Sequence, residues 1–422
     1  MRLVYAVVLR LGLAAPLAGQ VPAIPPARLP LDSIIHLITD KYRIPISSDS
    51  LYHVALGGIL KTLDPYSRYY SPAELKIFRE QLAGSIGGIG AIIDFDSTGH
   101  RWWFKGFTVA SPAHSAGAET GDTIVAVGRR PVKGASLDDI LSYLKGPPGS
   151  VVYLTVHRAG ETRPIEIQVT RAVIEFSSVN GVCRQRGEWQ YLLAPGSRVA
   201  YLELTNFARN SPIELDSALS AIARTGATGL VLDLRDNPGG ILESSVAMAD
   251  MFLDTGRIVT TQERGEADSV ILAKAGALTK VPVVILVNEN TISAAELFVA
   301  SLQDNHRAIV VGSRTFGKGV YQQVYDLPDS GAFRLTPGAY VRPSGVPIER
   351  HAPGADSVRG GVWPDSGMGI DLTPSEKEQF EQRIFSRASQ VPIEGQLTCP
   401  APPVDDRAIR RAIEVLSVKP HS

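Results

Sequence analysis

Two side chains that could together cleave a peptide bond stand 25 positions apart, Ser293 and Lys318. A serine hydroxyl is a weak nucleophile until a base takes its proton, and a neutral lysine can do this without histidine. Lys318 would have to be buried to be neutral near pH 7, because burial lowers a lysine pKa from its usual value of about 10.4. If the two side chains meet in the fold, they have the chemistry of a serine peptidase.

The run Ser293-Ala294-Ala295-Glu296 also fits a capping box, in which Ser293 would only close the first turn of a helix. A helix start suits a nucleophile equally well, because its free N–H groups and positive dipole end can hold a developing oxyanion. The position of Ser293 alone leaves both roles open.

A phosphate-binding loop is one rival interpretation. The run Gly312–Lys318 matches such a loop, but Gly319 replaces the hydroxyl residue that would bind magnesium. The next residues, Val320–Tyr325, are typical of a strand, where a phosphate-binding loop leads into a helix. The pattern therefore disfavours nucleotide binding.

A histidine triad is the second rival, with His306 and Asp304 on the helix expected after Ser293. A continuous helix would carry these residues about 20 Å and about 16 Å beyond the serine, so neither should reach it. Gln322 is better placed, because alternate residues of a strand share a face and its amide could orient the Lys318 amine. An exposed strand glutamine is the plainer alternative.

The run Leu234–Gly240 ends one predicted strand and opens a helix. Its Gly239-Gly240 pair would let backbone N–H groups approach a ligand closely and could add a second oxyanion donor. A tight turn between strand and helix is the plainer interpretation.

The elements around these residues alternate between strand and helix, which predicts a βαβ core. Helices are expected from Ser211, which would cap the first of them, from about Gly240 and from near Ser293. The expected strands are Val199–Leu204, Gly229–Leu234, Val283–Val287, Ala308–Val311, Val320–Leu327 and Ala332–Val341.

Glycines at 84, 87, 88 and 90 mark the start of a smaller domain of strands, with one helix capped by Ser136. Its strands are expected after Gly90 and at Phe107–Ala110, Thr123–Val127 and Tyr153–His157. The region before it is expected to be helical and includes a capping box at Ser71-Pro72-Ala73-Glu74. A final amphipathic helix is expected after Asp405.

Composition is that of an ordinary globular protein of two or three domains, with 422 residues, 44% hydrophobic and 20% charged. The 42 basic residues nearly balance the 43 acidic ones, so no nucleic-acid partner is expected. The two cysteines, Cys183 and Cys399, show no zinc spacing, so no metal or other cofactor is implied. Whether they pair stays open.

Residues 1–19 resemble a short secretory signal, with Arg2 before an apolar stretch that only Arg10 interrupts. The stretch is too short and too interrupted for a membrane span. We therefore expect export, to the bacterial periplasm or cell envelope.

An ordered series of short motifs runs along nearly the whole chain. They are Leu63–Ser67, Gly88–Gly90, Ser111–Asp122, Leu234–Gly240, Ser293–Glu296, Gln303-Asp304, Thr315–Gly319 and Tyr340–Gly345. Together they resemble the carboxyl-terminal processing peptidases, also called tail-specific proteases. The resemblance implies a mixed α/β multidomain fold: a signal peptide (1–19), a linker and helical region (20–83), a PDZ domain (84–172), a serine protease core (173–370) and a C-terminal extension (371–422).

The resemblance also implies roles. Ser293 would be the nucleophile, Lys318 the general base and Gln322 the residue that orients it. The N–H groups of Ala294 and of Gly239 or Gly240 would form the oxyanion hole. Asp304 matches a position discussed as catalytic in some members, which the helix distance argues against.

The PDZ domain would bind the C-terminal residues of a protein or peptide substrate as an added strand. The N–H groups of Gly87, Gly88, Ile89 and Gly90 would hold the terminal carboxylate, and peptide binding could switch the protease on. A regulatory binding partner and a homodimer are left open. The expected function is that of an exported serine endopeptidase that cuts near C-terminal tails.

The competing hypothesis is a catalytically silent PDZ scaffold, which need not keep Ser293, Lys318 and Gln322 together. The chain also departs from the family pattern at three places. Lys145 stands where the family often has arginine, Thr291-Ile292 is bulkier than usual, and His351–Gly361 lengthens a loop.

Overall fold

The computed structural model describes residues 30–108, 110–185, 188–328, 331–351, 358–380 and 406–417. The contacts divide the chain into two units between Ile59 and Leu60. The expected signal peptide and Cys399 lie outside the described residues, whereas Cys183 is disulfide-bonded. No helix among the described residues combines the length and the apolar character that a membrane span requires.

The region before the small domain is helical, as predicted. Its helices are α1 (Leu31–Lys41), α2 (Ser48–Lys61) and α3 (Pro72–Ala83). The predicted capping box opens α3: the Glu74 carboxylate accepts the Ser71 N–H at 2.9 Å, and the Ser71 hydroxyl accepts the Glu74 N–H at 3.4 Å.

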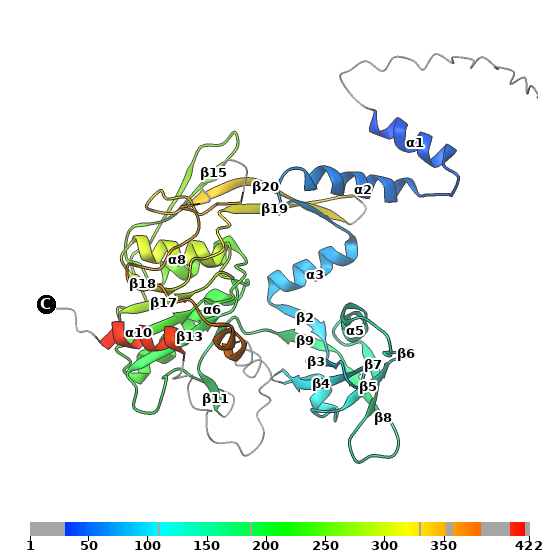
Figure 1. The fold of residues 1–422 in the computed structure, drawn as a ribbon, viewed down its shortest axis with the longest axis horizontal. Coiled ribbons are helices and arrows are strands. Elements are labelled where there is room, and N and C mark those ends of the chain that lie inside the picture. Colours follow the sequence, from blue (N-terminus) through cyan, green and yellow to red (C-terminus); the bar gives the residue numbers. More distant parts are fainter. Residues whose placement is uncertain are drawn as a thin grey trace, which may run out of the picture. The chain divides into compact units, whose positions relative to one another are not determined.

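The small domain is a six-stranded antiparallel sheet with its own core (Figure 1). Strand order is β3-β4-β5-β7-β8, with β6 beside β5, so β3 is an edge strand of the described sheet. The elements are β3 (Ala91–Asp96), β4 (Arg101–Phe107), α4 (Pro112–Ser115), β5 (Thr123–Val127), β6 (Arg130–Pro131), α5 (Leu137–Leu144), β7 (Val151–His157) and β8 (Ile165–Thr170).

One strand prediction in this domain is wrong. The strand expected at Phe107–Ala110 lies earlier, because β4 ends at Phe107. The Thr108 N–H then donates to the Gly90 carbonyl at 2.8 Å, and the Ser111 N–H donates to the Thr108 carbonyl at 3.2 Å. These bonds close a turn, and the apolar residues there gave a false strand signal.

The segments that precede and follow the small domain in the chain pair with each other. Strand β2 (Ser85–Gly88) pairs antiparallel with β9 (Ala172–Glu175), apart from the six-stranded sheet. A short hairpin, β11 (Cys183–Gln185) and β12 (Glu188–Gln190), follows.

The predicted βαβ core is confirmed as a five-stranded sheet, β10-β13-β14-β17-β18, parallel except for β10. Residues alternate between its two faces, as Leu230 and Leu232 show on one side and Val231 on the other. The strands are β10 (Val179–Asn180), β13 (Val199–Leu204), β14 (Gly229–Asp233), β17 (Val283–Val287) and β18 (Ala308–Gly312).

Helices cover both faces of this sheet, so both faces are apolar. The first face carries α6 (Ser211–Thr225), α7 (Leu242–Asp250) and α8 (Ala294–Asp304). The second carries the predicted terminal helix, α10 (Arg407–Ser417), and Figure 1 shows α8 and α10 on opposite sides of β17 and β18.

A second sheet brings a distant segment to the core. Its path is β1-β20-β15-β16, with β19 beside β20. Strand β1, which precedes the small domain, pairs with β20 through Arg68 and Arg334. The strands are β1 (Arg68–Tyr70), β15 (Arg257–Glu263), β16 (Ser269–Leu272), β19 (Val320–Asp326) and β20 (Ala332–Val341).

The cap expected at Ser211 is also wrong, by one position. Asn210 is the N-cap of α6, and Ser211 is the first helical residue. The Ser211 hydroxyl instead accepts the Ala208 N–H at 2.7 Å, which ties the helix start to the preceding loop.

Candidate active site

Ser293 is the N-cap of α8 and has a strained backbone, with φ 62° and ψ −121°. Positive φ is unfavourable for a residue with a β-carbon and costs on the order of 1–3 kcal/mol. The turn before it is held by the Ile292 N–H, which donates to the Asn237 carbonyl at 2.9 Å, and by the Thr291 hydroxyl, which donates to Leu234 at 2.8 Å. The buried, bonded Thr291 explains why a bulkier residue stands there.

Gly239 lies against this turn and could not be another residue. Its φ is 90°, and a β-carbon there would lie 2.6 Å from the Ile292 carbonyl oxygen and 2.9 Å from the Ala294 nitrogen. Only glycine combines this conformation with this approach. The turn after β14 and the turn before α8 therefore fit together at the serine.

The structure distinguishes the two glycines that the sequence left equivalent. The Gly239 N–H donates to the Asn237 side-chain oxygen at 2.9 Å and is already used. Among the described residues, no acceptor faces the N–H of Gly240 or that of Ala294. These two donors are free to bind a substrate oxygen.

The Lys318 amine is buried in a mixed environment. It donates to the Gln322 side-chain oxygen at 2.7 Å and lies 4.7 Å from the centre of the Tyr66 ring. Burial, and then the positive charge of Arg334, lower the Lys318 pKa to about 8, although Glu349, Glu296 and Asp64 oppose the shift. A lysine with this pKa is partly neutral near pH 8.

The Glu296 carboxylate joins the serine turn to the lysine loop. One oxygen accepts the N–H groups of Ser293 and Lys318, both at 2.8 Å. The other accepts the Gly317 N–H and the Thr315 hydroxyl, both at 2.6 Å. Burial raises the Glu296 pKa and these hydrogen bonds oppose the rise. Sequence reasoning treated Glu296 only as a helix-capping residue.

Ser293 and Lys318 share a neighbour, Tyr340, and no hydrogen bond joins their side chains. The Ser293 hydroxyl lies 3.3 Å from the Tyr340 hydroxyl. The Tyr340 hydroxyl also donates to the Lys318 main-chain carbonyl at 2.7 Å. The three residues therefore meet at one place, with the Lys318 amine directed to Gln322.

Tyr66 comes to this site from the segment before the small domain. Asp64 holds its turn by accepting the N–H groups of Tyr66 and Ser67, both at 2.7 Å, and Arg334 donates to the Tyr66 carbonyl at 2.9 Å. The Tyr66 hydroxyl is buried and has no hydrogen-bond partner. Burial raises its pKa, with Glu349 as the next cause. Tyr66 and Tyr340 lie within noted motifs, but nothing in their spacing placed them beside Lys318.

The residues of the rival triad lie elsewhere. Helix α8 runs unbroken to Asp304, whose carboxylate accepts Arg342 Nε at 2.8 Å and the Ser344 N–H at 2.9 Å. His306 follows the helix and is exposed. The run Gly312–Lys318, which matched a phosphate-binding loop in part, leads into strand β19 and not into a helix, as the sequence indicated.

The glycine run at the start of the small domain has free donors. Its carbonyls are occupied: Gly87 accepts the Gly146 N–H at 3.0 Å, and Ile89 accepts the Ser111 hydroxyl at 2.9 Å. In the described part of the chain, the N–H groups of Ile89 and Gly90 have no acceptor. The edge strand β3 begins immediately after them.

Arg171 rather than Lys145 binds the end of helix α5. Its guanidinium donates to the Leu144 and Tyr143 carbonyls, each at 2.9 Å. An arginine suits this task because its fork of N–H groups can bind two carbonyls at once. The sequence offered no signal for this contact, since Arg171 lies far along the chain.

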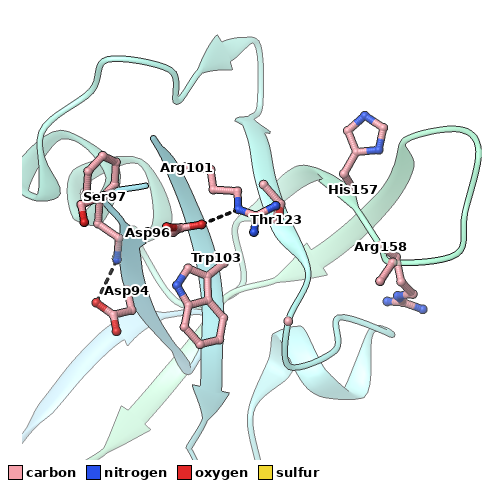
Figure 2. A pocket seen from close by; sticks show the side chains of 11 residues that line it. Asp94, Asp96, Ser97, Arg101, Trp103, Thr123, His157 and Arg158 are labelled. Atoms are coloured by element: carbon pink, nitrogen blue, oxygen red, sulfur yellow. Dashed lines mark hydrogen bonds and ion pairs between the residues drawn. The ribbon is translucent and has the colours of Figure 1, made fainter. Parts of the chain in front are cut away.

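A cavity of about 730 Å³ lies in the small domain, away from these residues (Figure 2). Its charged groups are already paired: Asp96 accepts Arg101 Nε at 2.9 Å, and Arg158 binds Asp122 at 2.8 Å. No candidate catalytic residue lines this cavity.

Known proteins match both domains. Residues 198–366 match peptidase family S41, and residues 108–158 match a PDZ domain. A carboxy-terminal-processing protease from Bartonella bacilliformis is 30% identical over 391 residues, covering 91% of this chain and 86% of that protein. A carboxyl-terminal-processing protease from Synechocystis is 32% identical over 309 residues, covering 73% and 71%.

The crystal structure of a protein assigned to the S41 proteases, from Bacteroides fragilis, matches with a TM-score of 0.50 and 17% identity. The match covers 94% of the present chain and 98% of the Bacteroides fragilis chain. At this level of identity the match supports the fold alone.

These matches, with the α/β core and the PDZ domain, define the class of the protein as a serine endopeptidase. The chain belongs to peptidase family S41, as one of the carboxyl-terminal-processing proteases. The predicted family and the mixed α/β fold with a PDZ domain and a protease core are confirmed.

Proposed function

We propose that the protein cleaves other proteins near their C-terminal tails, with Ser293 as nucleophile and Lys318 as general base. The observation that carries this proposal is the buried Lys318 amine, bonded to Gln322 and with its pKa lowered to about 8. A lysine with its ordinary pKa would be almost fully charged at neutral pH and could not accept a proton. Gln322 orients the amine, and Glu296 holds both loops together.

In the first step, Ser293 Oγ attacks the scissile carbonyl carbon while its proton passes to Lys318 Nζ. The carbon–nitrogen bond then breaks as the ammonium returns the proton to the leaving amine, which leaves an ester on Ser293. Water hydrolyses this ester with Lys318 again as base. The N–H groups of Ala294 and Gly240 stabilise the oxyanion, while Gly239 shapes the turn behind the serine.

The Lys318 amine has to come within hydrogen-bond reach of Ser293 Oγ before this reaction, with its bond to Gln322 kept by one of its N–H groups. Its main chain stays in place, because Glu296 binds the Lys318 N–H and Tyr340 binds the Lys318 carbonyl. Catalytic hydrogen bonds commonly tighten only when substrate is bound. Substrate binding therefore completes the pair.

The PDZ domain supplies tail recognition. The substrate carboxylate binds the free N–H groups of Ile89 and Gly90, and the tail adds as a strand to the open edge of β3. The glycines at 87 and 88 let the chain pass close to the end of α5; a β-carbon on Gly87 would lie 2.3 Å from the Gly146 oxygen. The apolar residues 1–19 support export to the bacterial periplasm or cell envelope.

The test is cleavage of an unstructured protein substrate by purified enzyme. We expect Ser293→Ala and Lys318→Ala each to abolish cleavage, because one removes the nucleophile and the other the base. His306→Ala, at the exposed residue of the rejected triad, should leave the rate unchanged. Cleavage that persists in either of the first two variants refutes the assignment, and an inactive wild-type protein that still binds tails favours the scaffold.

A further inference from the structure

The Tyr340 hydroxyl contacts both the hydroxyl of the candidate nucleophile and the main chain of the candidate base. Tyr340 lies on β20, is 3% exposed, and is anchored by its own N–H, which donates to the Gly319 carbonyl at 2.9 Å. Main chain and side chain of Tyr340 therefore both hold the lysine loop, at consecutive residues 318 and 319.

The proton of the Tyr340 hydroxyl can serve only one acceptor. The Lys318 carbonyl, at 2.7 Å, can only accept, whereas the Ser293 hydroxyl, at 3.3 Å, can also donate. The shorter bond therefore takes the tyrosine proton. The Ser293 proton is then left to point at the tyrosine oxygen, so Tyr340 fixes the rotation of the serine side chain.

We propose that Tyr340 is a positioning residue of this peptidase: its hydroxyl holds Ser293 Oγ at a fixed place relative to the Lys318 loop. This inference rests on the proposed function, in which Ser293 is the nucleophile. Without this contact, the serine side chain could rotate among its staggered rotamers, and only one of them would direct Oγ at both the substrate and the lysine.

The environment keeps Tyr340 out of the proton transfer itself. Burial raises its pKa well above the usual value, with the charge of Glu296 as the next cause. The phenol therefore stays protonated across the working range of the enzyme and does not compete with Lys318 as a base. Its contribution is geometric, and it should appear in kcat rather than in substrate binding.

The test is Tyr340→Phe, which removes one oxygen and keeps the ring. We expect kcat to fall by about 10-fold to 100-fold with KM nearly unchanged, the signature of an interaction that matters for the chemical step. The rate at which a fluorophosphonate labels Ser293 should fall by a similar factor. The pH midpoint of kcat/KM should stay where it is in the wild type, because Lys318 keeps its surroundings.

The matched control is Tyr321→Phe on the neighbouring strand β19. It also removes a tyrosine hydroxyl, which in the wild type is bonded to Glu263. It should leave kcat unchanged. Thermal unfolding is compared for Ser293→Ala alone and for Ser293→Ala combined with Tyr340→Phe, which gives the effect of the tyrosine change on the stability of the fold. The activity assays are run at a temperature below the lower of these two unfolding midpoints.

The outcomes separate the two claims. An active Ser293→Ala enzyme refutes the proposed function, and the role of Tyr340 with it. A second outcome is that Ser293→Ala is inactive, while Tyr340→Phe has the same kcat and labelling rate as the control Tyr321→Phe. This outcome refutes only the role of Tyr340. A rise in KM at unchanged kcat does the same, because it would assign Tyr340 to substrate binding.

Discussion

The burial of Lys318 lowers the stability of the folded state, and the proposed role of this residue as a base requires that burial. Its pKa is about 8 in the folded protein, below the ordinary lysine value of 10.5. The folded state therefore holds a disfavoured charge at every pH below about 8, and this penalty disappears as the pH rises towards the unfolded value. A difference of this size corresponds to about 3 kcal/mol. A residue with only a structural role would have no reason to carry it.

Lys318→Met should therefore stabilise the protein while abolishing catalysis. We expect the free energy of unfolding at pH 7 to rise by about 1–3 kcal/mol, since the lost bond to Gln322 offsets part of the relieved penalty. Denaturant unfolding at pH 7 and pH 10 measures the effect, which should shrink at the higher pH. Exposed Lys133→Met is the control and should change little. A less stable Lys318→Met protein would contradict the burial argument.

At the scale of elements, the site is the meeting of two turns and one strand. The turn after β14 fits against the turn before α8 at Gly239, and strand β20 presents Tyr340 to the second turn and to the lysine loop. Glu296 lies in the first turn of α8 and binds the loop before β19. Small shifts between these elements would separate the serine from its base.

Gly239→Ala tests this fit between turns. The new β-carbon would meet the Ile292 oxygen and the Ala294 nitrogen at under 3 Å, so the serine turn has to move. We expect kcat/KM to fall by at least about 100-fold, the effect expected for a displacement of about 1 Å at a reacting centre.

The control for Gly239→Ala is Gly226→Ala, at the end of α6. This glycine also has positive φ, 71°, but a β-carbon there would meet nothing within 4 Å. It should lower stability without lowering the activity of the folded enzyme. Equal activity losses in the two variants would show that backbone strain, and not the contact with the serine turn, is responsible.

For the whole molecule, the sequence predicted what depends on local pattern. The strands Val199–Leu204 and Val283–Val287 have the predicted bounds, because buried apolar runs between turn residues are strong signals. The strand Ala332–Val341 also has its predicted bounds. The ordered motifs predicted the family, which the matches confirm. The false strand after Phe107 shows the limit: a short apolar run became a turn through bonds to a distant glycine.

The contacts that the sequence could not predict are those between distant segments. Tyr66 reaches Lys318 because β1 pairs with β20, and Arg171 binds the end of α5 although it lies 27 residues beyond Leu144 in the sequence. The choice between Gly239 and Gly240 as a free donor depended on a single bond to Asn237. Contacts of this kind form only in the folded molecule, and no periodicity or motif spacing in the sequence predicts them.

The measurement that tests the account most directly is the pH dependence of kcat/KM in the wild-type enzyme. In the proposed mechanism the neutral form of Lys318 is the base, and burial lowers its pKa to about 8. The account predicts a plateau above about pH 8 and a fall of about tenfold per pH unit below it. A rate that stays constant from about pH 9 down to about pH 5 would contradict a lysine base.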